Sequence, residues 1–291
     1  MTTPLLPRAG SAPEPRDAVR ARRLRLVAAT VGTAVVCVVA LTVMVRFTLF
    51  TARGQQLDLE GMDSVDGSSG TMVTLLDGLG TVSIGTAALG LTLCVVLALG
   101  RRRIAHALGA VVIVGGANIT TQLLKREVID RPYLDVGYAL DNSLPSGHTT
   151  VVLSLVVAAL LVAPHGWRLA LASAGALIVT VTGASTVVAE WHRPSDVLAA
   201  LLVVPIWAAL VVLVLGWDPP PSGAPHGHSR WHGAVALAGA GLAGVVLLGV
   251  GVRPDDGWAD ISTAAPMLLL IGLATALSVG VCARLATTFA P

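Results

Sequence analysis

The sequence predicts an all-α fold, a polytopic bundle of transmembrane helices, and three observations support this prediction. The chain has 291 residues, of which 54% are hydrophobic and only 12% are charged, about half the charged share of an ordinary soluble domain. The mean hydropathy is +0.79. The apolar residues gather into eight runs, each close to the roughly 20 residues with which a helix crosses a bilayer. This composition argues against a soluble enzyme, a nucleic-acid binder and a disordered scaffold.

The eight runs give the expected helices in chain order. Residues 1–23 are rich in Pro, Ala and Arg, lack hydrophobic periodicity and are expected to form a disordered basic cytoplasmic tail. The second run is long enough to tilt or to begin in an interfacial turn, and the fourth is short because it stops at Pro164. The Pro- and Gly-rich segment 218–232 predicts a flexible cytoplasmic linker. The expected spans are residues 25–47, 72–99, 104–124, 149–164, 168–189, 197–217, 232–252 and 264–285.

The distribution of cations predicts the orientation of the bundle, because cytoplasmic loops of membrane proteins hold an excess of Lys and Arg. If the N-terminus is cytoplasmic and eight helices cross, twelve of the nineteen Lys and Arg residues lie on the cytoplasmic side. The other seven lie outside, together with fourteen of the seventeen acidic residues. We therefore expect a multi-pass protein of the cell membrane with a cytoplasmic N-terminus.

Two segments on the predicted outer side carry ionisable residues close to helix ends. One covers residues 125–132 and continues to 145–148, and the other covers residues 190–196. Ionisable groups at membrane depth or at helix ends cost free energy, so they are candidates for function by default. Because both segments face the same side, we expect them to meet at one rim of the bundle.

The residue types in the first segment suit the binding of phosphate. Lys125 offers a point charge and Arg131 offers paired planar donors to phosphate oxygens. Ser146 belongs to the run 145–148 that directly precedes the fourth span, where a hydroxyl and free backbone N–H groups suit an anionic oxygen. Gly147 leaves room for a ligand to approach the backbone closely.

The two histidines suit the transfer of a phosphoryl group. One of His148 and His192 can attack phosphorus while the other protonates the leaving oxygen. Asp196 follows His192 by four residues and is expected to hold its ring in one tautomer. Each residue alone also has an ordinary interpretation: a solvated loop histidine, a lipid-headgroup anchor at Lys125 or Arg131, or a helix cap at Asp196.

In order and spacing these residues resemble the type 2 phosphatidic acid phosphatase (PAP2) family, the membrane relatives of vanadium haloperoxidases. That family has a Lys…Arg-Pro motif, then Pro-Ser-Gly-His, then Ser-Arg…His…Asp. The resemblance covers residues 72–217 and implies a six-helix core over 24–217, completed by the first span. Two additional C-terminal transmembrane helices then occupy residues 233–291. The matching residues are Lys125…Arg131-Pro132, Pro145-Ser146-Gly147-His148 and Ser185…His192…Asp196.

The resemblance implies a role for each matched residue. His192 would be the nucleophile that forms a phosphohistidine, Asp196 would be its partner, and His148 would be the general acid. No metal ion and no other cofactor is implied, because fixed cations and backbone donors would stabilise the charge. The residues that would bind the phosphoryl oxygens are Lys125, Arg131, Ser146, Gly147 and Ser185.

The chain departs from the family pattern at two places. Five residues, where the family usually has six, separate Lys125 from Arg131. On a continuous helix the difference turns Lys125 by about 100°, so the segment is expected to unwind or bulge if both cations reach one phosphate. The Arg of the third motif is replaced by Thr186, and each charged hydrogen bond lost costs on the order of 1.5–3 kcal/mol. Our hypothesis is that Arg193 supplies the missing charge from another direction.

The preferred function is an integral membrane phosphatase that acts on a lipid phosphate or pyrophosphate, prenyl or glycerolipid, at the extracytoplasmic face. Its expected partners are this substrate and membrane lipids, with no nucleic acid, and its oligomeric state is left open. One alternative is a phosphotransferase that passes phosphate from the same phosphohistidine to an acceptor alcohol. Another is a catalytically inactive lipid-binding or transport protein, which the replacement at Thr186 keeps open.

Other features lie outside these motifs. The acidic, Gly- and Ser-rich segment 51–70 is expected to be a solvated connector, with a lid over the site as the alternative. The charged loop 253–260 is a candidate cover for the mouth of the site or a partner contact. The histidines at 226, 228 and 232 lack acidic and Cys partners, so a metal site is not expected there. The three cysteines lie in apolar runs and predict no disulfide framework.

Overall fold

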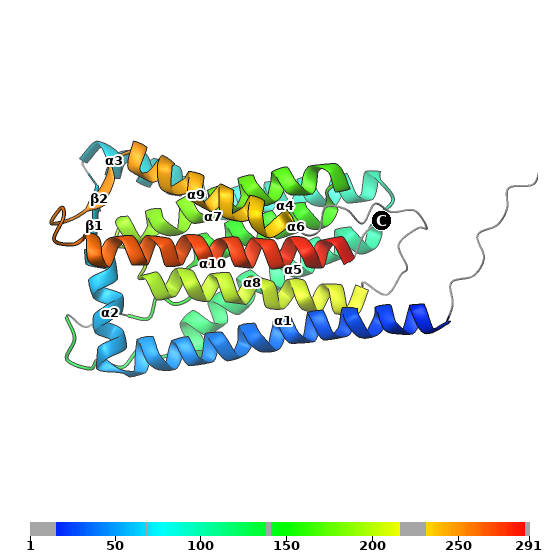
Figure 1. The fold of residues 1–291 in the computed structure, drawn as a ribbon, viewed down its shortest axis with the longest axis horizontal. Coiled ribbons are helices and arrows are strands. Elements are labelled where there is room, and N and C mark those ends of the chain that lie inside the picture. The colour runs from blue at the N-terminus through cyan, green and yellow to red at the C-terminus, as the bar shows by residue number, and fades with distance from the viewer. Residues whose placement is uncertain (1–15, 68, 138–140, 216–230, 289–291) are drawn as a thin grey trace, which may run out of the picture.

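The computed structural model of the protein describes residues 16–67, 69–137, 141–215 and 231–288. In this part of the chain, long helices lie side by side along one axis, and a short two-stranded sheet lies at one end (Figure 1). The elements are α1 (Arg16–Phe50), α2 (Ala52–Asp63), β1 (Val65–Gly67), α3 (Ser69–Gly80), α4 (Ile84–Gly100), α5 (Ile104–Leu123), the π-helical turn η1 (Leu124–Val128), α6 (Gly147–Val162), the 3-10 turn η2 (His165–Trp167), α7 (Arg168–Val188), α8 (Pro194–Leu215), α9 (His232–Gly249), β2 (Val252–Pro254) and α10 (Ile261–Thr288).

The predicted fold class, a polytopic all-α bundle, is confirmed. Six helices of the described chain are long and apolar enough to cross a membrane: α1, α5 with η1, η2 with α7, α8, α9 and α10. The apolar helix α6, with 16 residues, is shorter than these, as its early stop at Pro164 predicts. Each of the eight expected runs therefore corresponds to a helix or a helix pair, in the expected order.

The second expected span is broken into two helices. α3 and α4 meet at a bend of 53°, and counted together they make a seventh candidate span. The break has a local cause, because Ser83 starts a new helix with a capping box. Its hydroxyl accepts a hydrogen bond from the backbone N–H of Thr86, and the Thr86 hydroxyl oxygen accepts one from the Ser83 N–H.

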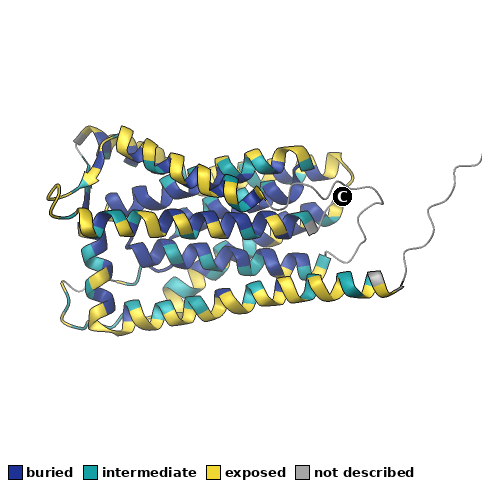
Figure 2. Cartoon of the chain, in the orientation of Figure 1, coloured by how far each residue is buried: buried dark blue, intermediate teal, exposed yellow. Residues whose placement is uncertain are grey.

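The most deeply buried helices are α7 and α8, whereas α1 presents most of its surface to the outside (Figure 2). The C-terminal pair α9 and α10 packs on α7 and shares its hydrophobic core. A Cβ atom added at Gly239 of α9 would lie 2.0 Å from the carbonyl oxygen of Ser173, so the α7 and α9 backbones approach closely because a glycine is present. The additional helices are thus an integral part of the bundle.

Two expectations about the N-terminal third of the chain are wrong. Helix α1 begins at Arg16, so residues 16–23 are helical and do not belong to a disordered tail. The segment 51–70 is not a solvated connector, because it folds into α2, β1 and the start of α3. Thr51 caps α2 by accepting a hydrogen bond from the N–H of Gly54, and the buried face of α2 includes Gln55 and Asp58. Apart from Met62, polar and glycine residues form this face, so no hydrophobic run marks it.

Helix α2 crosses the end of the bundle at which α1 finishes and at which α8 and α10 begin (Figure 1). We call this the α2 end; the N-terminus of α1 lies at the opposite end. Part of the charged loop after α9 forms β2, which pairs antiparallel with β1 at the α2 end, with Val65 opposite Pro254.

The remaining expectations concern the linker, a metal site and the cysteines. Residues 1–15, 216–230, His226 and His228 lie outside the described residues, and His232 starts α9. The described residues include no group of His, Cys, Asp or Glu side chains that could hold a metal ion. Cys37, Cys94 and Cys282 are buried free thiols.

Candidate active site

The second and third sequence motifs meet at the α2 end of the bundle. His148 lies in the first turn of α6, and His192 lies in the tight turn between α7 and α8. The centroids of their imidazole rings are 6.3 Å apart, with an angle of 67° between the ring planes. The two histidines therefore face one small volume, although 43 residues separate them in the sequence.

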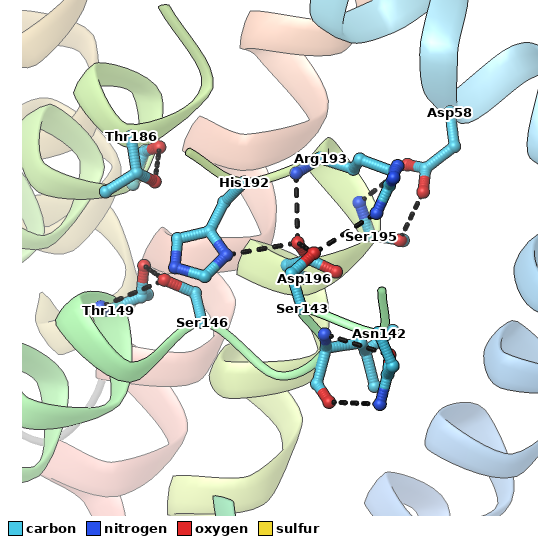
Figure 3. Close-up of polar contacts among 12 residues, drawn as sticks. Asp58, Asn142, Ser143, Ser146, Thr149, Thr186, His192, Arg193, Ser195 and Asp196 are labelled. Atoms are coloured by element: carbon cyan, nitrogen blue, oxygen red, sulfur yellow. Dashed lines mark hydrogen bonds and ion pairs between the residues drawn. The ribbon is translucent and has the colours of Figure 1, made fainter. Parts of the chain in front are cut away.

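His192 and Asp196 form a buried pair. Nδ1 of His192 lies 3.1 Å from Oδ2 of Asp196, and the two residues are 7% and 1% exposed (Figure 3). A carboxylate can only accept, so Nδ1 is the ring nitrogen that donates a proton to Asp196. The predicted partnership of these two residues is therefore present as a contact, and Nε2 is the ring nitrogen that does not bond to Asp196.

The turn that carries His192 is tied to the end of α7. The backbone N–H groups of Trp191 and His192 both donate to the carbonyl oxygen of Thr186, at 3.0 and 3.1 Å. Glu190 adopts a positive φ of 57°, which lets the chain reverse at the helix C-terminus. The Thr186 hydroxyl donates to the carbonyl of Gly183 within its own helix. Because a threonine side chain is uncharged, it cannot supply the positive charge of the Arg in the family motif.

The Pro-Ser-Gly-His motif forms the beginning of α6. Ser146 is fully buried and is the N-cap, because its hydroxyl oxygen accepts hydrogen bonds from the N–H and the hydroxyl of Thr149. The backbone N–H of Ser146 donates to the carbonyl oxygen of Asp196 at 2.9 Å, which joins the second motif to the third. A Cβ atom at Gly147 would meet only the Gln122 side chain, at 3.8 Å, so space remains beside this helix start.

The first motif contains the expected bulge. Lys125 lies in the π-helical turn η1, which closes with a hydrogen bond from the N–H of Ile129 to the carbonyl of Leu124 at 3.0 Å. The backbone is extended at Ile129, so Arg131 does not continue the helix. Both cationic side chains are half-buried. A prediction made from one missing residue in the spacing is thus confirmed in the backbone.

Electrostatic interactions connect the two cations with the rest of the site. Lys125 interacts with Asp196 and with His148. Burial lowers the pKa of Arg131, and the charge of Arg193 lowers it further, whereas Asp58 and Asp196 raise it. Arg131 therefore lies among the charges that surround Asp196.

The structure does not bring every predicted residue to the same place. The guanidinium of Arg193 donates to the Ser143 hydroxyl at 3.1 Å and lies on the side of Asp196 remote from Nε2 of His192 (Figure 3). This placement does not support the hypothesis that Arg193 replaces the missing family Arg. The Ser185 hydroxyl is buried and has no hydrogen-bond partner among the described residues.

Two residues of the loop before α6 were missed in the sequence. The Ser143 hydroxyl donates to Oδ2 of Asp196 at 2.5 Å, and this oxygen also accepts from the backbone N–H of Arg193 at 3.0 Å. The Asn142 amide nitrogen donates to the carbonyls of Lys125 and Ile129, at 3.2 and 2.8 Å. Asn142 thus joins the first motif to the second, and no motif or spacing marks either residue.

A third missed residue, Asp58, comes from α2. Its carboxylate accepts from the backbone N–H of Ser195 at 2.9 Å and from the Ser195 hydroxyl at 2.5 Å. Burial raises the pKa of Asp58 to about 6, and the nearby Asp196 raises it as well, whereas the Ser195 hydrogen bonds and Arg193 lower it. An acidic residue in a polar segment gives no sequence signal of such burial.

Comparisons with known proteins assign the chain to a protein family. No curated protein and no solved structure matches the chain at a significant level. The family model of the PAP2 superfamily matches residues 26–219, from the first turns of α1 to just beyond α8, and so includes all three motifs. The match covers well over half of the chain and supports a phosphatase type of activity in general. The chain therefore belongs to the PAP2 superfamily.

Proposed function

We propose that the protein is an integral membrane phosphatase that hydrolyses a lipid phosphate or lipid pyrophosphate, of the prenyl or glycerolipid type, through a phosphohistidine on His192. One observation carries this proposal. Nδ1 of His192 is held at 3.1 Å by the buried carboxylate of Asp196, and the ring of His148 lies 6.3 Å away, centroid to centroid. That distance leaves room for a phosphoryl group between a nucleophile and a general acid.

The reaction has two steps. In the first, Nε2 of His192 attacks phosphorus, the bond from phosphorus to the leaving oxygen breaks, and His148 gives its proton to that oxygen. In the second, water attacks the phosphohistidine, His148 takes a proton from the water, and the bond between phosphorus and nitrogen breaks. The carboxylate of Asp196 stabilises the positive charge that the His192 ring gains during attack.

The phosphoryl oxygens carry negative charge throughout, and fixed donors would stabilise it. Lys125 and Arg131 come from the first motif. The backbone N–H groups of Gly147 and His148 begin α6, where the first helical N–H groups have no partner within the helix. These donors are part of the fold before substrate binds, so no metal ion is required in this mechanism.

A lipid substrate suits the position of the site. The site lies at the end of apolar helices, so a phosphate head at the α2 end leaves a hydrocarbon tail level with the bilayer. Trp191, 44% exposed, has its ring centroid 5.4 Å from that of His148, and amphipathic aromatic rings favour the boundary between water and lipid. The distribution of Lys and Arg supports an extracytoplasmic α2 end and a cytoplasmic N-terminus.

Phosphate release by the purified protein tests the proposal. The substrates are phosphatidic acid, a prenyl phosphate, a prenyl pyrophosphate and the water-soluble glycerol phosphate, each assayed in chelator. We expect release from at least one lipid, little from glycerol phosphate, and none with His192→Ala. Equal release by His192→Ala would overturn the nucleophile assignment, and loss of activity in chelator would overturn the metal-free mechanism. An added alcohol separates hydrolysis from phosphotransfer, because transfer yields the phosphorylated alcohol.

A further inference from the structure

Helix α2 connects two parts of the site that are far apart in sequence. We propose that α2 is a crosspiece that fixes Arg131 relative to the His192–Asp196 pair, and that Gln55 and Asp58 are its two positioning residues. This inference rests on the proposed function, since it assigns these residues to the same reaction. Neither residue touches His192, so each acts through the backbone that it holds.

Gln55 holds the segment that carries Arg131. Its side-chain amide nitrogen donates to the carbonyl of Pro132 at 2.8 Å and to the carbonyl of Leu49, at the end of α1, at 2.7 Å. Gln55 is 1% exposed, so both donors are used away from water. Because Pro132 directly follows Arg131, its anchored carbonyl limits the directions that the Arg131 side chain can take.

Asp58 holds the first turn of α8. Its two oxygens accept from the N–H and the hydroxyl of Ser195, at 2.9 and 2.5 Å, so a carboxylate from another helix caps the N-terminus of α8. Asp196 is the next residue along. The rotation of this first turn determines where the Asp196 carboxylate lies, and that carboxylate in turn orients the ring of His192.

The two positioning residues lie on one face of α2, three residues apart, and the helix is wedged between its neighbours. A Cβ atom at Gly54 would lie 1.9 Å from the carbonyl oxygen of Phe47, and one at Gly61 would lie 3.1 Å from Cγ of Pro194. These glycines bring α2 into direct contact with the end of α1 and the beginning of α8. The helix therefore has little freedom to slide or turn.

The charges around Asp58 agree with a positioning role. The charged groups that act on it are Asp196 on α8, Arg193 in the preceding turn, and Arg131. Two carboxylates and two guanidinium groups therefore act on one another electrostatically. Removing the Asp58 charge would change the electrostatic interactions that hold Asp196 in place, without removing a group that touches substrate.

The test uses steady-state kinetics of the purified full-length protein, with matched controls on the same helix. Asp58→Asn is compared with Asp63→Asn, and Gln55→Leu is compared with Gln56→Leu. Asp63 is exposed, and the Gln56 side chain bonds only to Glu60, one turn away on α2, among the hydrogen bonds of the described residues. Geranyl pyrophosphate and dioctanoyl phosphatidic acid serve as probes, one for each lipid class.

The two positions should affect different kinetic constants. Asp58→Asn should lower kcat by about 10- to 100-fold with little change in KM, because the nucleophile loses its alignment. Gln55→Leu should raise KM by about tenfold with little change in kcat, because Arg131 binds the phosphoryl group in ground state and transition state alike. The control variants should behave as wild type. A residue that only supports the fold would lower the amount of folded enzyme and leave both constants unchanged.

A double-mutant cycle tests whether Asp58 acts through Ser195. Ser195→Ala removes one hydroxyl and serves as the second variant if Asp58→Asn does not accumulate as folded protein. We expect the double variant to be no slower than the slower single variant, because both remove the same contact. Kinetic constants for Asp58→Asn, Gln55→Leu and Ser195→Ala equal to those of the controls would overturn the inference. An inactive wild type, or an active His192→Ala variant, would instead overturn the proposed function.

Discussion

Oδ2 of Asp196 accepts a hydrogen bond from Nδ1 of His192 at 3.1 Å, and the same oxygen accepts two more. The other donors are the backbone N–H of Arg193 and the Ser143 hydroxyl. Three donors at one buried oxygen keep the carboxylate ionised and fix its direction. The position of the His192 ring is therefore determined by the loop before α6 and by the first turn of α8 together.

The first prediction concerns this pair. Asp196→Asn keeps the size of the side chain but removes the charge that stabilises a positive His192 ring. We expect kcat to fall by about 100-fold or more while KM changes little, because the charge is needed mainly in the transition state. Phosphate release at saturating substrate measures the effect. Asp77→Asn, an exposed position on α3, is the control, and an Asp196→Asn enzyme as fast as this control would contradict the assignment.

The second prediction concerns His148 as the general acid. His148→Gln removes the proton donor, so it should slow substrates with a poor leaving group more than substrates with a good one. We expect a loss of about 100-fold or more with an alkyl phosphate and a much smaller loss with p-nitrophenyl phosphate. The ratio of the two losses is the measurement. Equal losses for both substrates would remove His148 from that role, and His165→Gln, at the opposite end of the bundle, is the control.

The part of the site that the sequence predicts is the part that short-range geometry determines. His192 lies just before α8 and Asp196 lies in its first turn, so a separation of four residues already keeps the two side chains close together. A serine and a glycine before an apolar run predict the helix start at Ser146. The shortened spacing before Arg131 predicts a bulge, and the turn η1 provides it.

Long-range contacts determine the part that the sequence does not predict. Asp58 is buried because α2 crosses the start of α8, and nothing in a polar segment reveals that crossing. The direction of the Arg193 side chain depends on Ser143, fifty residues earlier. The bend between α3 and α4 does have a local signal, the cap at Ser83, but an average of hydropathy over the run hides it.

The third prediction separates two arginines. Arg131→Ala should raise KM by about 10- to 100-fold, because a charged hydrogen bond to a phosphoryl oxygen is worth about 1.5–3 kcal/mol. Arg193→Ala should instead lower kcat by about tenfold with little change in KM, because its guanidinium supports Ser143 and thereby Asp196. Substrate titrations of the two variants give both constants. A rise of KM for Arg193→Ala as large as that for Arg131→Ala would show that Arg193 binds phosphate after all.

The fourth prediction concerns the dependence of stability on pH. Burial raises the pKa of Asp58 from 3.8 to about 6, so between these values the folded protein binds a proton that the unfolded chain has released. This group therefore favours folding fully below about pH 4, and its contribution is lost as pH rises through 6. Thermal unfolding in detergent between pH 4 and 7 measures it. Asp58→Asn, which cannot ionise, should flatten this part of the profile and should be relatively more stable near pH 7.

The Asp58→Asn variant also allows the effect on stability to be compared with the effect on activity. If Asp58 only supported the fold, a replacement that raises stability near pH 7 would leave turnover per folded molecule unchanged. A positioning role predicts that Asp58→Asn is both more stable and slower than wild type. Burial of the Asp58 carboxylate lowers the stability of the folded protein near pH 7, but the same carboxylate aligns Asp196 for catalysis. Asp63→Asn is the matched control on the same helix: Asp63 is an exposed residue, and its pKa is raised by partial burial and by the negative charges of Glu190 and Asp255, not by Asp196. A profile for Asp58→Asn that coincides with that of wild type would contradict the burial of a charged Asp58.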